Sequence, residues 1–284
     1  MPPPGTTYVD ISERAFKGRF YKFFKNFVLF KKKRCYYGNV SAFTLAEVLI
    51  TLGIIGVVAA MTMPSLIQDK QNKERVSQLK KVYSTLSQAY LQAVSEKGTP
   101  NEWGMTGMYE ESSHYIFATA FRPYLKLSKD CIDIPENAVR KECGSGANLS
   151  SYRNARSVIL IDGTLVTFRI YNGACTANYS GSSSNNALKN TCGAISIDLN
   201  GKRLPNKNGE DRFMFYFTKN GLVPLGIKKA SIEFEKACNR KIELPYPTYG
   251  PGNMYGCTAW VLYNENMDYL KCDDLSWNGK TKCK

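Results

Sequence analysis

Apolar residues are continuous over one part of the chain and periodic over the next. From Phe43, 21 consecutive residues contain Glu47 as their only charge. Further along, residues 65–97 contain neither Gly nor Pro, and apolar residues recur there at steps of three and four, which is typical of an amphipathic helix. Gly98, followed by Pro100, is a helix stop signal. The two patterns predict one helix over residues 43–97, on the order of 80 Å long. Its predicted buried stripe consists of Val76, Leu79, Val82, Leu86, Ala89, Tyr90, Ala93 and Val94.

The first half of this helix has the composition of a membrane span. At 1.5 Å per residue, the apolar run 43–63 covers roughly 30 Å, the thickness of one hydrocarbon core. Glu47 lies near its end, where a carboxylate costs less than at the centre. Residues 31–34 form a block of four cations just before the run. By the positive-inside rule this block stays in the cytoplasm, so we expect residues after the span to be exported.

A different pattern begins after Gly98. Residues 157–173 hold two β-branched runs around Asp162-Gly163, which predicts a hairpin. Residues 180–187 are a polar loop without core-forming side chains. We therefore expect residues 99–284 to form an antiparallel, β-rich head. Further strands are predicted within 191–201, 211–227 and 257–264, with turns at Asn200-Gly201 and Asn220-Gly221. The predicted fold class is α+β, with one long N-terminal helix packed on this head.

The cysteines favour an oxidising compartment for the head. Cys35 precedes the apolar run, and the other eight all follow it without CxxC spacing. An even, dispersed set of this kind indicates a disulfide framework rather than a metal site, although eight cysteines allow 105 connectivities. The simplest pairing joins sequence neighbours: Cys131–Cys143, Cys175–Cys192, Cys238–Cys257 and Cys272–Cys283.

Charge is concentrated before the apolar run. The chain has 38 Lys and Arg against 24 Asp and Glu, a net charge of +14. Residues 1–42 carry nine of the cations and two of the acids, so half of the net charge lies in this leader. Net charge is therefore a weak argument for nucleic-acid binding. Residues 1–30 fit either a short amphipathic helix at a membrane surface or a sequence upstream of a later start at Val28 or Leu29.

The segment from residue 43 resembles the N-terminus of type IV pilins and of the pseudopilins of type II secretion systems. The shared pattern is a basic leader, Phe43-Thr44-Leu45, Glu47 as the fifth residue, Ile54-Ile55-Gly56, Ala59-Ala60, and Pro64 as the twenty-second. The strong resemblance covers about 27 residues, whereas the long helix and β-rich head agree with that family in plan.

The resemblance implies a maturation and assembly pathway. Prepilin peptidase would remove residues 1–42 by cutting between Ala42 and Phe43, and would N-methylate the new Phe43 amine. Ala42 departs from the family, which usually has Gly before the cut, and the leader is longer than usual. The mature chain would leave the bacterial inner membrane with the help of an assembly platform and join like subunits in a pilus or pseudopilus. Physical reasoning gives Glu47 a partner there, since a carboxylate in hydrocarbon must pair or protonate, and a neighbouring subunit's Phe43 amine fits.

Two features of the span have alternative interpretations. Glu47 either pairs with that amine or reaches the nearby lipid headgroups. Pro64 removes a helix hydrogen bond, so it either bends or locally melts the helix for a purpose or leaves a kink without one.

Other candidate chemistry is sparse. The one histidine, His114, is interpreted as a surface residue, and no P-loop, GxGxxG or HExxH motif is present. We therefore expect no catalysis and no cofactor other than a candidate Ca²⁺ site, whose alternative is a polar turn. That site would draw oxygen ligands from Asp198, Asn200, Asn206, Glu210 and Asp211. The C-terminal run 270–284, with Trp277, is interpreted as a stapled, solvated tail rather than a nucleic-acid contact.

These observations lead to one expected function and two alternatives. The expectation is a prepilin-type structural subunit, held by the membrane before assembly. The alternatives are a minor pilin with an adhesive or DNA-binding head, and an exported enzyme for which the span is only an anchor. The poor supply of catalytic residues argues against the enzyme.

Overall fold

The computed structural model describes residues 44–134, 142–143, 155–180, 186–238 and 254–283. The chain divides into two units, Met1–Val58 and Ala59–Lys284, and the boundary lies inside a long helix. The N-terminal leader, Cys35, Ala42 and Phe43 lie outside the described residues.

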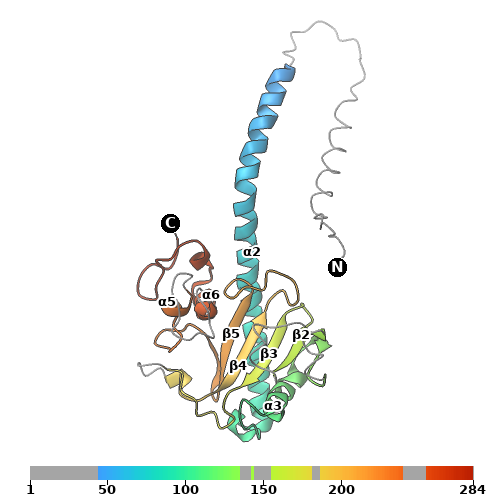
Figure 1. The fold of residues 1–284 in the computed structure, drawn as a ribbon, viewed down its shortest axis with the longest axis vertical. Helices are drawn as coiled ribbons and strands as arrows, with labels where there is room; N and C mark the ends of the chain where they lie inside the picture. Colours follow the sequence, from blue (N-terminus) through green and yellow to red (C-terminus); the bar gives the residue numbers. More distant parts are fainter. Residues whose placement is uncertain (1–43, 135–141, 144–154, 181–185, 239–253, 284) are drawn as a thin grey trace, which may run out of the picture. The chain divides into compact units, whose positions relative to one another are not determined.

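The long helix, α2, spans Leu45–Lys97 and includes Pro64 without interruption (Figure 1). The helix was predicted over residues 43–97, so it begins two residues later than predicted and ends at the predicted residue. The local melting considered at Pro64 is therefore absent from the structure. At Ser65 the hydroxyl donates to the Thr62 carbonyl at 2.9 Å, next to the position where proline supplies no N–H.

An antiparallel sheet forms the centre of the head. Its six strands pair in chain order, so each strand pairs with the next one in sequence. The strands are β1 (Leu127–Asp130), β2 (Arg156–Leu160), β3 (Leu165–Ile170), β4 (Thr191–Asp198), β5 (Arg212–Thr218) and β6 (Gly221–Pro224). The predicted hairpin is confirmed as β2–β3, and Gly163 in its turn has φ +88°, a conformation that glycine adopts without strain.

The register aligns core side chains in rows across the strands. Phe168 of β3 is paired with Ile195 of β4, which is paired with Phe215 of β5. These three side chains are fully buried on the face that packs against α2. Their neighbours on β5, Met214 and Tyr216, point to the opposite face and form a smaller cluster. This alternation is the two-residue period of a sheet that is covered on both faces.

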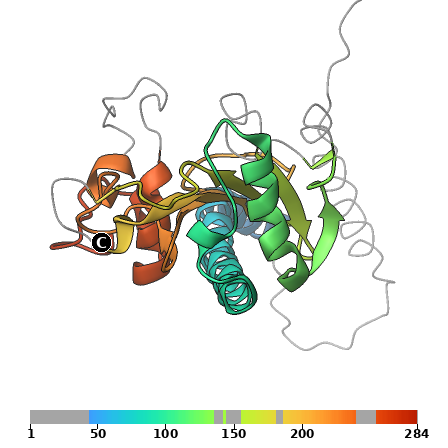
Figure 2. The ribbon, with the colours of Figure 1, turned by 90° about the horizontal axis from the view of Figure 1, so that it is seen from below.

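Two helices cover the larger face of the sheet. The second half of α2 and α3 (Glu111–Phe121) lie together against it (Figure 2). Tyr83 of α2 stacks on Phe215 with ring centroids 5.3 Å apart, and Phe117 of α3 stacks on Phe217 at 4.0 Å. The predicted stripe is confirmed, because all of its residues are buried except the half-buried Val94.

The C-terminal part of the head corrects one prediction. Residues 257–264 were expected as a strand, but Cys257 ends a 3₁₀ helix and the rest form the helix α6 (Thr258–Asn264), which follows the short helix α5 (Phe234–Ala237) in sequence. β-Branched and aromatic residues favour a strand only where they fit a pleated surface. Here four consecutive residues, 258–261, are buried, and Trp260 stacks on Phe234 at 3.9 Å between ring centroids. Short 3₁₀ helices complete the fold at Pro100–Glu102, Arg122–Tyr124, Asn186–Leu188, Tyr255–Cys257 and Asp268–Leu270.

Four disulfides staple the head, with the pairing of sequence neighbours described above. The first three bridges are buried, whereas Cys272 and Cys283 are partly exposed. In the chain-entropy account, each loop of this length adds about 2–4 kcal/mol of stability. The head's core is divided among one long helix, one sheet and residues 254–283, called the C-terminal segment below, which have little regular structure. The bridges therefore add stability to a head made of several separate parts.

The contact between α2 and the sheet predicts unequal effects of two leucine substitutions on one helix. Leu86 is fully buried and Leu91 is 65% exposed. Leu86→Ala should lower the unfolding free energy of the head by about 2–5 kcal/mol, because it leaves a cavity. Leu91→Ala is the matched control and should change it by less than about 0.5 kcal/mol. Denaturant unfolding of the oxidised chain in detergent, followed by near-UV circular dichroism, would measure both. Equal effects would contradict this assignment of the buried face.

Candidate functional site: the bare apolar helix and its cap

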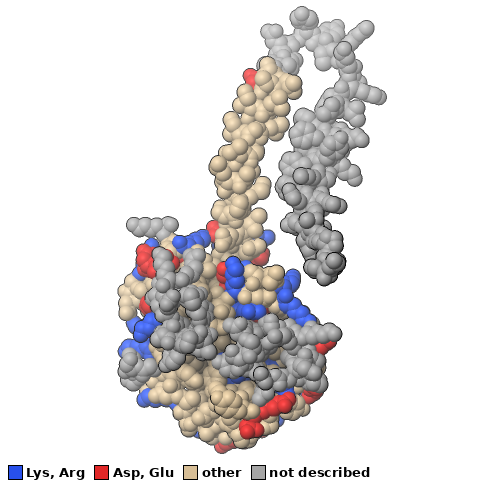
Figure 3. Space-filling model, in the orientation of Figure 1, with Lys and Arg blue, Asp and Glu red and all other residues tan. Residues whose placement is uncertain are grey.

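The first part of α2 presents apolar side chains around its whole circumference. Between residues 45 and 71 every side chain is exposed, except for the half-buried Ala59 and Asp69. This segment is long and apolar enough to cross a membrane, and none of its most apolar stretch is buried inside the protein. Figure 3 shows its surface as almost free of charged side chains, in contrast to the head. An exposed apolar surface of this extent marks a site that lipid or another protein covers.

Glu47 has a second role that sequence analysis missed. Its Oε2 accepts the Thr44 backbone N–H at 2.7 Å and the Thr44 hydroxyl at 2.9 Å. In return, the Glu47 N–H donates to Thr44 Oγ1 at 3.2 Å. This reciprocal arrangement is a capping box, which satisfies backbone N–H groups that a helix start leaves without partners. The signal was present in the sequence as Thr-x-x-Glu ahead of an apolar run.

The cap uses only half of the carboxylate. Both Thr44 donors reach Oε2, and among the described residues no donor contacts Oε1. Glu47 therefore can cap its own helix and still accept a hydrogen bond from a second group. The polar neighbour one turn further along α2, Thr51, donates its hydroxyl to the Val48 carbonyl at 3.0 Å, so the Oε1 atom is open to a donor from outside this part of the helix.

A second capping box in the head has the same geometry. Thr99 donates its backbone N–H and hydroxyl to Glu102 Oε2 at 2.7 Å and 3.0 Å. It opens the 3₁₀ helix that follows Gly98, outside the apolar segment. The described residues thus contain two equivalent Thr-x-x-Glu caps, of which only the first lies in the candidate membrane span.

His114 is a buried structural residue, so its interpretation as a surface residue is wrong. Its side chain is 2% exposed, and its Nδ1 accepts the Ile170 backbone N–H at 3.1 Å. Its Nε2 therefore carries the proton and donates to the Met108 carbonyl at 2.9 Å. The imidazole thus joins α3, β3 and the preceding loop. The error has a simple cause: the apolar partners of α3 come from distant strands that the local pattern "EESSHYIF" does not reveal.

The candidate Ca²⁺ ligands form a turn whose carboxylates bind protein donors. Asp211 accepts the backbone N–H groups of Asn206 and Lys207 and the side-chain amide of Asn200. Asp198 accepts a hydrogen bond from the Arg212 guanidinium at 2.9 Å. Burial raises the Asp198 pKa to about 6, although Arg212 opposes this shift. In the part of the chain that the structure describes, no group of three His, Cys, Asp or Glu side chains is arranged to hold a metal.

The C-terminal run is largely exposed, as expected for a solvated tail, but Leu275 and Trp277 pack on the head. Trp277 is partly buried and its Nε1 donates to the Gly226 carbonyl at 3.1 Å. Its ring lies 5.3 Å from that of Trp260, centroid to centroid. The Cys272–Cys283 bridge closes this run into a loop. The predicted disulfide is present, and the loop that it closes contains Trp277, which packs on the head.

Comparison with known proteins adds a family to this description. Residues 65–236, more than half of the chain, match the family described as "Family of unknown function (DUF6613)". The chain belongs to this family. The matched range begins near the end of the exposed segment 45–71 and ends within α5, so it covers the packed half of α2 and the whole sheet. No curated protein and no solved structure matches the chain.

The geometry around His114 predicts a depressed pKa. Burial is the main cause that lowers its pKa from the ordinary 6.5, and Arg156 and Arg169 add to this effect. A histidine with a lowered folded pKa stabilises the fold above pH ~6.5, and this contribution decreases as pH falls through the folded value. Because this is the sole histidine, its ring protons can be followed by NMR without ambiguity. We expect a midpoint below 6.5; a midpoint at or above it would contradict the buried, neutral ring.

Proposed function

We propose that the chain is a prepilin-type structural subunit that assembles into a type IV pilus or a type II secretion pseudopilus. The observation that carries this proposal is the bare first half of α2, which exposes apolar side chains on all sides. Such a helix needs lipid before assembly and like helices afterwards. In this proposal it spans the bacterial inner membrane once, with its N-terminus in the cytoplasm and the head exported.

The two halves of α2 are suited to two different environments. Up to Ile67 its exposed residues are mostly apolar, with Glu47 as the one charge from Leu45 onward, and from Asn72 onward it buries one face against its own head. Lipid and neighbouring helices are equally apolar, so transfer between them depends on close packing and on polar pairs rather than on a hydrophobic gain. Gly53 and Gly56 leave open space around them, which permits close approach of another helix.

Glu47 supplies the polar pair in this mechanism. Cleavage after Ala42 by prepilin peptidase would leave a new cationic amine at Phe43, one residue before the capping box. A positive charge at a helix N-terminus is unfavourable because the helix dipole is also positive there. The Glu47 carboxylate of a neighbouring subunit would offset that charge, because its Oε1 atom is available to accept a hydrogen bond from the amine. We propose that this contact with the Phe43 amine, methylated as in the family, sets the axial position of adjacent subunits.

Cleavage is the first test of this proposal. The mature chain should begin with Phe43, and its N-terminal residue should be heavier by one methyl group. Mass spectrometry of the N-terminal peptide, from cells with and without a functional prepilin peptidase, would measure this. Ala42→Gly should be processed at least as fast as the native chain, because Gly is the family's usual residue there. A chain that keeps its leader in cells with an active peptidase would contradict the proposal.

The charge of Glu47 is the second test. Glu47→Gln keeps a side chain able to cap the helix but removes the charge that pairs with the amine. We expect the amount of this chain in sheared filaments to fall about tenfold, as losing a charged hydrogen bond costs on the order of 1.5–3 kcal/mol. Its level in membranes should stay unchanged. Quantitative immunoblots of sheared and membrane fractions would measure both.

Glu102→Gln is the matched control for this experiment. It makes the same chemical change in the equivalent cap of the head, so filament yield should match that of the native chain. Equal yields for Glu47→Gln and the native chain would remove the pairing role. A native chain that stays in membranes, with all other filament components present, would count against the structural-subunit proposal as a whole.

A further inference from the structure

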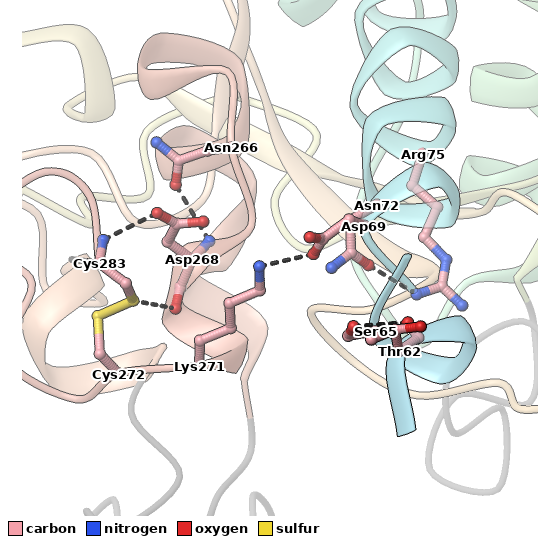
Figure 4. A network of polar contacts seen from close by, with 10 residues as sticks. All are labelled: Thr62, Ser65, Asp69, Asn72, Arg75, Asn266, Asp268, Lys271, Cys272 and Cys283. Carbon is pink, nitrogen blue, oxygen red and sulfur yellow. Dashed lines mark hydrogen bonds and ion pairs between the residues drawn. A yellow bond between two sulfur atoms is a disulfide. The ribbon is translucent and has the colours of Figure 1, made fainter. Parts of the chain in front are cut away.

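A polar cleft separates α2 from the C-terminal segment of the head. Its volume is about 610 Å³, within the usual range for small-molecule sites. Asp69 and Asn72 line it on the α2 side, and residues 263–268, Lys271 and Lys282 line it on the other. Figure 4 shows Lys271 reaching across this space from the C-terminal segment to Asp69 of α2. Two segments about 200 residues apart in sequence therefore form one site.

Hydrogen bonds and a disulfide hold one wall of the cleft in place. Asn266 uses both ends of its side chain: its Oδ1 accepts from Trp260 Nε1 and from the Asp268 N–H, each at 3.1 Å. Its Nδ2 donates to the carbonyls of Asn264 and Thr281 at 3.0 Å and 3.1 Å. The Asp268 carboxylate accepts the Cys283 N–H at 2.8 Å, next to the disulfide that closes this loop (Figure 4). A site held in this way loses little entropy when it binds a ligand.

The charges in the cleft are balanced. Three lysines and three carboxylates line it, and two of the carboxylates are paired. Asp69 pairs with Lys271 at 2.6 Å, and Glu265 pairs with Lys80 at 2.6 Å. A balanced cleft has no strong preference for an anion or a cation. It offers hydrogen-bond donors and acceptors side by side, which suits hydroxyl groups because each hydroxyl both donates and accepts.

One donor in the wall of the cleft has no partner among the described residues. The Nδ2 atom of Asn264 is buried, and no hydrogen-bond acceptor contacts it within the described residues. A buried donor without a partner costs free energy, and such groups are rare in folded proteins. Asn264 is the last residue of α6 and lies on the lining of the cleft. Rotation of the Asn264 side chain into the cleft would let a ligand oxygen satisfy this donor.

An aromatic ring borders the cleft. Tyr263 is 67% exposed, and its ring makes an edge contact with Trp277 at 6.0 Å between centroids. Tyr263 also lines an adjoining groove of about 460 Å³, whose other walls are mostly apolar. Because Trp277 contacts the Tyr263 ring, this exposed ring provides a flat apolar surface beside the polar cleft. The combination of an aromatic face with nearby amides and carboxylates matches a sugar ring, which has apolar C–H faces and a hydroxyl-bearing edge.

We propose that this cleft binds a neutral saccharide. The sugar's C–H face lies against Tyr263, one of its oxygens accepts from Asn264 Nδ2, and its other hydroxyls bind the amides and charged groups of the cleft. Because the site lies within the head and α2, it does not depend on whether the chain assembles into filaments.

The test is binding of the full-length chain in detergent micelles to neutral trisaccharides. The panel is maltotriose, cellotriose, mannotriose, galactotriose and chitotriose, with trigalacturonate as an anionic comparison. Calorimetry and saturation-transfer NMR would measure affinity and locate the sugar protons that contact the ring. We expect at least one neutral sugar to bind more tightly than trigalacturonate, with its ring C–H protons receiving the strongest transfer.

Three variants assign the binding to the cleft. Tyr263→Ala should weaken binding about tenfold by removing the flat surface, whereas Tyr263→Phe should retain it. Asn264→Asp has the same shape but replaces the donor with an acceptor, and should also weaken binding about tenfold. Tyr109→Ala is the control, since Tyr109 is 86% exposed and does not line the cleft. Absence of binding to every neutral sugar, tighter binding of trigalacturonate, or equal binding by the native chain and Tyr263→Ala would overturn the proposal.

Discussion

The packing of one face of α2 on the sheet is the contact on which the rest of the structure depends. From Asn72 onward, this face buries residues such as Leu79 and Leu86 against the rows of core side chains that the strand register aligns. The head therefore has no complete core without the helix, and within the described residues the helix has no fully buried side chain before Asn72. That division leaves the first part of α2 as an apolar rod, which the proposed functions of membrane anchor and filament core both require.

Glu47 shows how a local and an intermolecular role fit in one side chain. Thr44 uses one carboxylate oxygen to complete the helix start, and the other oxygen remains available. The cap orients the carboxylate, so a partner amine would meet a group already held in place rather than a flexible one. The presence of an equivalent cap at Thr99 and Glu102 shows that this motif is a local device for starting helices. What distinguishes Glu47 is its location in an apolar segment.

The C-terminal segment is held by long-range contacts rather than by regular secondary structure. Trp277 anchors it on Trp260, Lys271 ties it to Asp69, and the Cys272–Cys283 bridge closes its loop. These contacts create the polar cleft as a consequence of attaching the segment to α2. The cleft is therefore a feature of this attachment, and its donors and acceptors are fixed by the same bonds that stabilise the segment.

The sequence by itself determined the features that have a local physical cause. The period of its apolar residues predicted α2 and its buried stripe, Asp162-Gly163 predicted the β2–β3 hairpin, and short spacing suggested the disulfide partners. Only the tertiary structure decided features whose partners are distant in sequence. Residues 258–264 form a helix because Trp260 packs on Phe234, and His114 is buried because Ile170 and Met108 bind its ring. The cleft brings Asp69 next to Lys271, a contact that no local pattern specifies because it exists only once the C-terminal segment has folded back onto α2.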